Sequence, residues 1–322
     1  VDGSRPDVMI VVDCGTNSKE SIDYLKSLGI FVIVIDHHKL TTEGSKNCIL
    51  INPHVNDLED ENQAWSEVSA AGLVFKFLHG LIKYRRELKD PVADKIKLSQ
   101  IIDLAGMGTI ADLVPLQGEN RILAWYALRH LRNNKRLGLL ALLKESKVSN
   151  LETLSSADIS FRLAPRINAS GRLSDASIPV ELLLTESPEF AQKSAKELGD
   201  LNNERQMIQR KMVEEAESMI SDLSSDQSAY ILHNKEWHPG VVGIVASRLS
   251  RRLNRPCIIL GNEGDTIKGS GRSVGGVDLV KVLTGCELLL KHWGGHPMAV
   301  GISLSEEKLE AFSNTFNQVI DR

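Results

Sequence analysis

The chain has 322 residues, of which 42% are hydrophobic and 25% are charged. This length suggests two domains, and the composition is typical of a globular protein with a sizeable core. No apolar run approaches the roughly 18 residues needed to cross a bilayer, so we exclude a membrane-spanning protein. The formal net charge of −4 argues against a nucleic-acid binder that relies on overall positive charge, so any contact with DNA has to come from a local basic groove.

Four cysteines are scattered along the chain without CxxC spacing, at Cys14, Cys48, Cys257 and Cys286. This pattern argues against zinc knuckles and against a disulfide framework, and it fits a reducing cytoplasm. We therefore expect a cytoplasmic protein. The first residue is Val rather than Met, and a strand pattern begins within a few residues of it. We expect the chain to be a fragment whose natural start is missing.

The first part of the chain alternates short apolar runs with helical segments. Residues 7–12 (DVMIVV) and 30–35 (IFVIVI) are rich in β-branched side chains, and a helical stretch at 18–28 lies between them. We predict that both runs are buried parallel strands of a βαβ unit, with a third strand at 48–52. Amphipathic helices then follow, at residues 66–84, 91–107 and 119–133. Together these elements indicate an α/β fold.

A long helix is predicted after this region. Ser187 and Pro188 form a helix start, with a cap residue followed by proline at the first helical position. Apolar residues then recur every three to four positions from Ala191 to Met219, except across Glu204-Arg205. At about 1.5 Å per residue the helix would span roughly 50 Å, so we interpret it as a spacer between two domains.

The second domain begins near residue 228 and alternates strands with helices. The predicted strands cover 229–233, 257–260, 266–270 and 298–304, and the predicted helices cover 241–253, 277–291 and 305–320. The predicted organisation is therefore a parallel-sheet α/β domain over 1–185, a connecting helix over 186–224 and a smaller α/β domain over 225–322.

Groups that bind divalent cations follow two neighbouring strands. Asp13 ends the first strand, and Asp36, His37 and His38 end the second. Active sites of open α/β sheets lie at the carboxyl ends of strands, and carboxylate oxygen with imidazole nitrogen suits Mn²⁺. A lone Asp after a strand is usually a helix cap, and a lone His is usually structural. Two imidazoles and a carboxylate at a sheet end are nevertheless costly unless they are paired or bind a metal, so the residues alone leave both interpretations open.

Seven segments in the chain form an ordered set of motifs. They are VVDCGT (11–16), VIDHHK (34–39), GTIADLVPL (108–116), RINASGR (166–172), HPGVVGIVASRL (238–249), GSGRS (269–273) and GGHPMAVG (294–301). The first three resemble motifs of the DHH phosphoesterase superfamily, and the other four resemble those of its RecJ-like members. The resemblance implies a two-domain cleft enzyme that degrades single-stranded DNA from its 5′ end, in DNA repair and recombination, by two-metal phosphodiester hydrolysis with Mn²⁺ or Mg²⁺.

The resemblance also implies roles for the residues after the strands. Asp13 would bridge two metal ions, and His37 and Asp112, the latter in GTIADLVPL, would hold one of them. Asp36 and His38 would orient the ligands and the scissile phosphate. The family's first motif, an Asp-rich segment that supplies ligands to both metals, has no counterpart here. We therefore expect an incomplete metal site, weak metal binding and poor cleavage by this chain.

The resemblance also implies a substrate-binding set, in which Arg172 belongs to the first predicted domain and the other members belong to the second. It consists of Arg172, Ser270, Gly271, Arg272, Gly295 and His296. Arginine side chains match phosphate oxygens in a bidentate manner, and glycines let the backbone approach a phosphodiester closely. Seen alone, GSGRS is more typical of a glycine-rich turn beside a strand than of a binding site, and His238 could be a helix cap. The expected partners are single-stranded DNA with a free 5′ end, a single-strand-binding protein and a helicase, and we expect a monomer that does not contact membranes.

Two other functions remain open on the sequence. The chain resembles DHH phosphodiesterases that act on short oligonucleotides or cyclic dinucleotides, although RINASGR favours the RecJ-like branch. A non-catalytic DHH-derived scaffold that binds DNA is the second alternative, and the retained Asp13, His37 and Asp112 argue against it.

Overall fold

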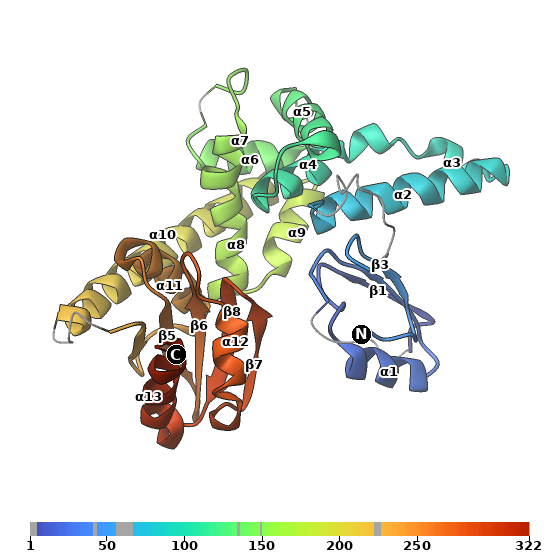
Figure 1. The fold of residues 1–322 in the computed structure, drawn as a ribbon. Helices are drawn as coiled ribbons and strands as arrows, with labels where there is room; N and C mark the ends of the chain where they lie inside the picture. Colours follow the sequence, from blue (N-terminus) through green and yellow to red (C-terminus); the bar gives the residue numbers. More distant parts are fainter. Residues whose placement is uncertain are drawn as a thin grey trace. The chain divides into compact units, whose positions relative to one another are not determined.

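The computed structural model of the protein describes residues 5–40, 44–55, 67–133, 136–148, 150–221 and 227–321 (Figure 1). Contacts divide the chain into two compact units. The first unit comprises Val1–Pro165 and Glu181–Lys196, and the second comprises Arg166–Val180 and Glu197–Arg322. This division differs from the domain boundaries expected from the sequence, which remain a prediction. In the described part of the chain, no helix is both long enough and apolar enough to span a membrane.

The first unit contains a parallel sheet of three strands in the order β1-β2-β3, as the α/β interpretation predicts. The strands are β1 (Val8–Val12), β2 (Phe31–Ile35) and β3 (Ile49–Ile51), and α1 (Lys19–Ser27) connects the first two (Figure 1). The last residue of each strand pairs with the last residue of its neighbour. The register therefore aligns the carboxyl ends of all three strands at one edge of the sheet.

Burial differs between the first two strands. In β2, Val32 and Val34 are fully buried between Ile22 of α1 and the rest of the sheet. In β1, by contrast, Val8 and Ile10 are 49% and 55% exposed. The prediction of a buried strand is right for β2 and wrong for β1, which lies at the edge of the described sheet. An apolar run indicates a strand, but it does not show how many faces of that strand the neighbours cover.

The helices of the first unit follow the sheet. They are α2 (Ala70–Glu87), α3 (Pro91–Lys95), α4 (Ile102–Ala111), α5 (Gly118–Arg132), α6 (Leu137–Glu145) and α7 (Ser156–Asp158), with the 3-10 turn η1 (Leu98–Gln100) before α4. The helix α9 (Ser177–Leu184) begins in the second unit and ends in the first. The π-helical segment η2 (Ile159–Leu163) joins α7 to α8 (Ala164–Leu173).

The single helix predicted at 91–107 is wrong, because the chain breaks into α3, η1 and α4. Asp90 caps α3 by accepting a hydrogen bond from the Val92 amide at 2.9 Å. The Arg86 guanidinium donates to the carbonyl oxygens of Ala93 and Ile96, at 3.2 and 2.8 Å. A side chain from α2 thus satisfies the carbonyl groups that a continued helix would have used.

The predicted long helix is confirmed as α10 (Pro188–Ser221), which has 34 residues (Figure 1). The Ser187 hydroxyl accepts a hydrogen bond from the Phe190 amide at 3.2 Å, which is the expected cap. Towards its carboxyl end, Met212 and Ala216 pack in a core of the second unit.

The second unit is built on a five-stranded sheet in the order β4-β5-β6-β8-β7. Its strands are β4 (Tyr230–His233), β5 (Cys257–Glu263), β6 (Thr266–Arg272), β7 (His292–His296) and β8 (Ala299–Leu304). Only β4 and β5 pair in parallel, and the other pairs are antiparallel. One face packs against α10 and α11 (Pro239–Leu253), and the opposite face packs against α12 (Leu279–Thr284) and α13 (Leu309–Ile320), a helix preceded by the short turn η4 (Glu306–Lys308).

The helix predicted at 277–291 is wrong in its second half. α12 ends at Thr284, a short 3-10 turn η3 (Glu287–Leu289) follows, and the chain then enters β7, which the sequence analysis did not predict. The β7 sequence is HWGGH, so it lacks the run of β-branched residues that indicates a strand. Pairing with β8 holds it in the sheet.

Candidate functional site

Two carboxylates and an imidazole meet at the carboxyl edge of the first sheet. Asp13 follows β1 with a φ of 62°, a left-handed conformation that Asp adopts more easily than most residues. The His37 Nε2 atom lies 3.2 Å from Asp13 Oδ1 and 3.7 Å from Asp112 Oδ2. Asp112 is the C-cap of α4 and lies far beyond His37 along the chain. The fold thus brings together the three residues that the sequence analysis selected as metal ligands.

Asp36 is a buried carboxylate that holds the neighbouring residues of this cluster in position. Its side chain is 1% exposed and accepts hydrogen bonds from the amides of Thr16 and His37, at 3.0 and 2.8 Å. The Nδ1 atom of His38 lies 2.7 Å from the same carboxylate. Burial alone would raise the pKa of Asp36, but these hydrogen bonds lower it to about 2. Asp36 is therefore a fixed anion that orients His38.

The electrostatics of the cluster favour a bound cation. The pKa of His37 is raised, mainly by its hydrogen bond to Asp13, against the opposing effect of burial. The pKa of Asp112 is also raised, first by burial and then by the charge of Asp13, although His37 lowers it. Ligand atoms of Asp13, His37 and His38 all lie within 4.8 Å of one another. These carboxylate and imidazole donors fit a divalent ion such as Mn²⁺.

One supporting residue was missed in the sequence analysis. Asn52 directly follows β3 and is 6% exposed. Its amide nitrogen donates to the Thr16 hydroxyl at 2.8 Å and to the His38 carbonyl oxygen at 2.9 Å, and its oxygen accepts from the His54 amide at 2.8 Å. Asn52 therefore ties together the loops after all three strands. Its position at the predicted end of the third strand was the available signal.

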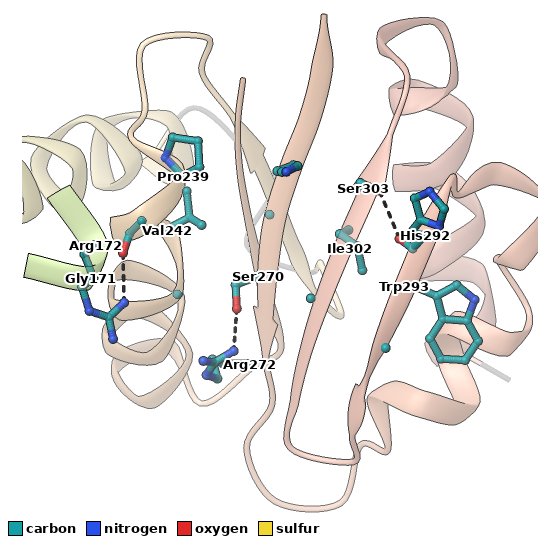
Figure 2. A pocket seen from close by; sticks show the side chains of 16 residues that line it. Gly171, Arg172, Pro239, Val242, Ser270, Arg272, His292, Trp293, Ile302 and Ser303 are labelled. Carbon is teal, nitrogen blue, oxygen red and sulfur yellow. Dashed lines mark hydrogen bonds between the residues drawn. The ribbon is translucent and has the colours of Figure 1, made fainter. Parts of the chain in front are cut away.

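The second unit contains a pocket of about 650 Å³ (Figure 2). It is lined by Arg172 from α8, by the first turn of α11 and by parts of β6, β7 and β8. The Arg172 guanidinium donates to the Gly240 carbonyl oxygen at 2.9 Å, while the Arg272 guanidinium donates to the Ser270 hydroxyl at 2.6 Å. His238 accepts a hydrogen bond from the Gly240 amide at 3.1 Å, so it is the cap of α11.

Three arginines concentrate positive charge in this unit. Burial, which disfavours the charged form, lowers the pKa of Arg172, Arg205 and Arg272. The positive charge of Arg172 lowers the pKa of Arg205 and Arg272 further. Among the residues that the structure describes, none of the three pairs with a carboxylate. The buried Nε atom of Arg205 also finds no hydrogen-bond partner in the described part of the chain. Such a group of uncompensated cations is suited to an anionic ligand.

Arg205 did not enter the predicted site. Its guanidinium donates to the side chains of Asn202 and Gln209 on the same helix, at 2.9 and 3.0 Å. In the sequence, Arg205 could have been found from the break in the apolar spacing of the long helix at Glu204-Arg205.

The predicted substrate-binding residues do not all lie at the pocket. Arg172, Ser270 and Arg272 line it. The α-carbon of Gly271 faces the core instead, since a Cβ atom there would lie 2.7 Å from Val300 Cγ2. In the described part of the chain, the pocket lining includes Gly294 but neither Gly295 nor His296.

Comparisons with known proteins identify the two parts of the chain. Residues 3–109 match the DHH family, N-terminal domain, and residues 226–322 match the DHHA1 domain. The single-stranded-DNA-specific exonuclease RecJ of Bacillus subtilis strain 168 is 38% identical over 98% of this chain and 38% of its own length.

Solved structures of RecJ proteins are also similar to this chain. A RecJ exonuclease bound to manganese superposes with a TM-score of 0.80 at 30% identity, over 98% of this chain and 76% of the solved chain. RecJ of Thermus thermophilus in complex with Mn²⁺ gives a TM-score of 0.84 at 32% identity, over 98% of this chain and 45% of that chain. The chain spans 38% to 56% of the length of the curated RecJ proteins that it matches. These findings show that the chain belongs to the RecJ family and combines a DHH N-terminal domain with a DHHA1 domain.

Proposed function

We propose that the protein is a single-stranded-DNA-specific exonuclease that degrades DNA from the 5′ end by metal-dependent phosphodiester hydrolysis. The observation that carries this proposal is the convergence of Asp13 and Asp112 on His37, at 3.2 and 3.7 Å. The relatives that share this fold are named as exonucleases of this type.

The cluster after the strands would hold the metal. Asp13, His37 and Asp112 are the proposed ligands of Mn²⁺ or Mg²⁺, and His38 is close enough to join them. The ions, when bound, would supply positive charge at the phosphodiester and lower the pKa of a water molecule. Asp36 holds the His38 ring through its Nδ1 atom, at 2.7 Å. The other ring nitrogen of His38 is therefore directed away from Asp36.

The pocket of the second unit would hold the 5′ end of the strand. Ser270 and Arg272 offer a hydroxyl and a guanidinium that already contact each other at 2.6 Å, and Arg172 adds a second guanidinium. Among the described residues, no carboxylate pairs with these two guanidinium groups, so the negative charge of a terminal phosphate would complement them. A single guanidinium group can donate two parallel hydrogen bonds to phosphate oxygens. We include Arg205 in this group because its buried Nε atom has no hydrogen-bond partner among the described residues, and because the charge of Arg172 adds to the lowering of its pKa by burial.

The wider role follows from the same chemistry. Degradation of single strands with a free 5′ end suits DNA repair and recombination, in the cytoplasm. A helicase that produces single strands and a single-strand-binding protein that covers them are the partners we propose. We propose that the enzyme acts as a monomer.

The test uses the longest form of the protein that its gene encodes. It is incubated with Mn²⁺ and DNA strands labelled at the 3′ end, with duplex DNA and RNA as controls. Progressive shortening from the 5′ end, on single-stranded DNA alone and lost in Asp13→Ala, is the expected result. Turnover of dinucleotides without cleavage of long strands would instead indicate a phosphodiesterase for short oligonucleotides, and binding without any cleavage would indicate a scaffold.

A further inference from the structure

The Asp112 carboxylate comes from the helical part of the first unit, whereas the other proposed ligands follow strands. Asp112 ends α4, a helix that contacts both α2 and α5 (Figure 1). Glycines bring these helices close together. A Cβ atom at Gly106 would lie 2.3 Å from the Cβ atom of Ala127 in α5, and a Cβ atom at Gly108 would lie 2.5 Å from that of Ala71 in α2. This packing fixes α4, so the position of the carboxylate depends on the turn that follows the helix.

The turn after α4 contains a strained residue. Leu113, which directly follows Asp112, has a φ of 61°. This is the left-handed conformation in which glycine is the usual residue after a helix. The Leu113 side chain is 68% exposed, so its burial does not stabilise the conformation. A strained backbone persists only where surrounding contacts hold it, so contacts elsewhere in the turn have to do so.

Asn120, in the first turn of α5, makes such contacts. Its side chain belongs to a residue that is 3% exposed. The amide nitrogen donates one hydrogen bond to the Pro115 carbonyl oxygen at 3.0 Å and another to the Glu67 carbonyl oxygen at 2.8 Å. Pro115 lies three residues after Asp112, whereas Glu67 lies before α2. One buried amide group thus connects the turn after α4 to a second segment of the chain.

This second segment packs against the strand that leads to His37. Val68, the residue after Glu67, is 1% exposed and packs in one core cluster with Ile35, the last residue of β2. His37 follows Ile35 by two residues. The hydrogen bonds of Asn120 therefore connect the turn after α4 to the part of the sheet that carries the imidazole ligand.

We propose that Asn120 is a positioning residue of the metal site. It holds the left-handed turn at Leu113 and thereby places the Asp112 carboxylate where it can share a divalent ion with His37. Asn120 does not bind the ion in this role, because both of its hydrogen bonds go to backbone carbonyl oxygens. The inference rests on the proposed function in one respect, since it takes Asp13, His37 and Asp112 as the metal ligands.

The experiment measures Mn²⁺ binding directly, without DNA, in the longest form of the protein that its gene encodes. The electron paramagnetic resonance signal of free Mn²⁺ gives the dissociation constant for the wild type and for Asn120→Ala. We expect Mn²⁺ to bind about tenfold more weakly to the variant, the effect of losing a contact that orients a ligand. Degradation of single strands should fall further with saturating Mg²⁺ than with saturating Mn²⁺, because Mg²⁺ demands near-ideal octahedral geometry.

Two variants separate positioning from a loss of stability. Leu113→Gly removes the strain in the turn, so the double variant Asn120→Ala/Leu113→Gly should bind Mn²⁺ about threefold more tightly than Asn120→Ala. Asn317→Ala is the matched control in the second unit. Asn317 accepts a hydrogen bond from the Ala229 amide at 3.0 Å and donates one to the Ser313 carbonyl oxygen at 3.2 Å. Its loss should lower Tm and leave Mn²⁺ binding unchanged.

Each outcome decides the proposal. Equal Mn²⁺ affinity in the wild type and Asn120→Ala overturns the positioning role, even where the wild type degrades single strands from the 5′ end. A loss of affinity that Leu113→Gly does not relieve, or that Asn317→Ala reproduces, also overturns it, because the loss then does not arise from the turn. If the Asn120 effect and its relief are present while no strand is degraded, the positioning role stands and the exonuclease proposal fails.

Discussion

The edge of the three-stranded sheet and the face of the five-stranded sheet have opposite chemistry. At the first, Asp13 and Asp112 converge on His37. At the second, Arg172 and Arg272 surround a pocket and find no carboxylate partner among the described residues. Each region is therefore complementary to a ligand of opposite charge, a cation in the first case and an anion in the second. A phosphodiesterase requires both.

The two regions also differ in construction. The first depends on loops that follow strands, on the left-handed conformation of Asp13 and on the buried Asp36. The second lies on paired strands, where register fixes the spacing of Ser270 and Arg272. A change in the first region should abolish the chemistry, whereas changes in the second should reduce binding by one phosphate contact at a time.

The largest effect is expected for Asp13→Ala. Removal of a proposed ligand takes away several kcal/mol of charge stabilisation, so cleavage of single-stranded DNA should fall by about 10³-fold or more. Binding of a 5′-phosphorylated strand in EDTA should remain within about twofold, because the pocket of the second unit is unchanged. The rate of nucleotide release from the 5′ end measures the loss of cleavage, and binding isotherms measure the retained affinity. An active Asp13→Ala variant would contradict the assignment of the metal site.

The next effect is expected for Asp36→Asn, which keeps the shape of the side chain but removes its charge. Its contacts with His38 and Thr16 orient the cluster, and loss of such contacts weakens metal affinity by about 10- to 100-fold. Titration of activity with Mn²⁺ measures this change, and excess Mn²⁺ should restore part of the rate. An unchanged Mn²⁺ requirement would show that Asp36 has only a structural role.

A smaller effect is expected for Arg205→Gln in the second region. If Arg205 helps to neutralise the terminal phosphate, the preference for a 5′ phosphate over a 5′ hydroxyl should fall by about tenfold, the size of one charge-assisted hydrogen bond. Arg252→Ala is the control, because Arg252 pairs with Glu217 away from the pocket lining. If Arg205→Gln weakens binding of strands with a 5′ phosphate and strands with a 5′ hydroxyl equally, Arg205 stabilises the helix and does not contact the phosphate.

The smallest effect concerns the scaffold of the first region. Asp23 accepts hydrogen bonds from the side chains of Lys19, Ser45 and Asn47, which hold its pKa well below the ordinary value of 3.8. A carboxylate with a depressed folded pKa stabilises the fold above its ordinary pKa, and this contribution is lost as the pH falls further. Asp23→Asn should lower Tm by at most a few degrees at neutral pH, with the difference shrinking steadily as the solution is made strongly acidic. A constant difference across this range would exclude the carboxylate charge as the cause.

Local patterns in the sequence determined many of the elements and most of the residues for which we propose chemical roles. The run of β-branched residues in β2, the cap at Ser187 and the spacing of apolar residues in α10 are all local, and each was confirmed. The motifs selected Asp13, His37 and Asp112, which the fold brings together. These features were accessible because neighbouring residues specify backbone conformation, and because ligand types are visible in the sequence.

Features that depend on contacts between segments distant in sequence were decided by the tertiary structure alone. The break between α3 and α4 depends on Arg86 of another helix, and the exposure of β1 depends on what covers its faces. β7 is a strand only because β8 pairs with it. Sequence periodicity reports the conformation of one segment, whereas register and packing are properties of two segments together, so no single stretch of this chain specifies them.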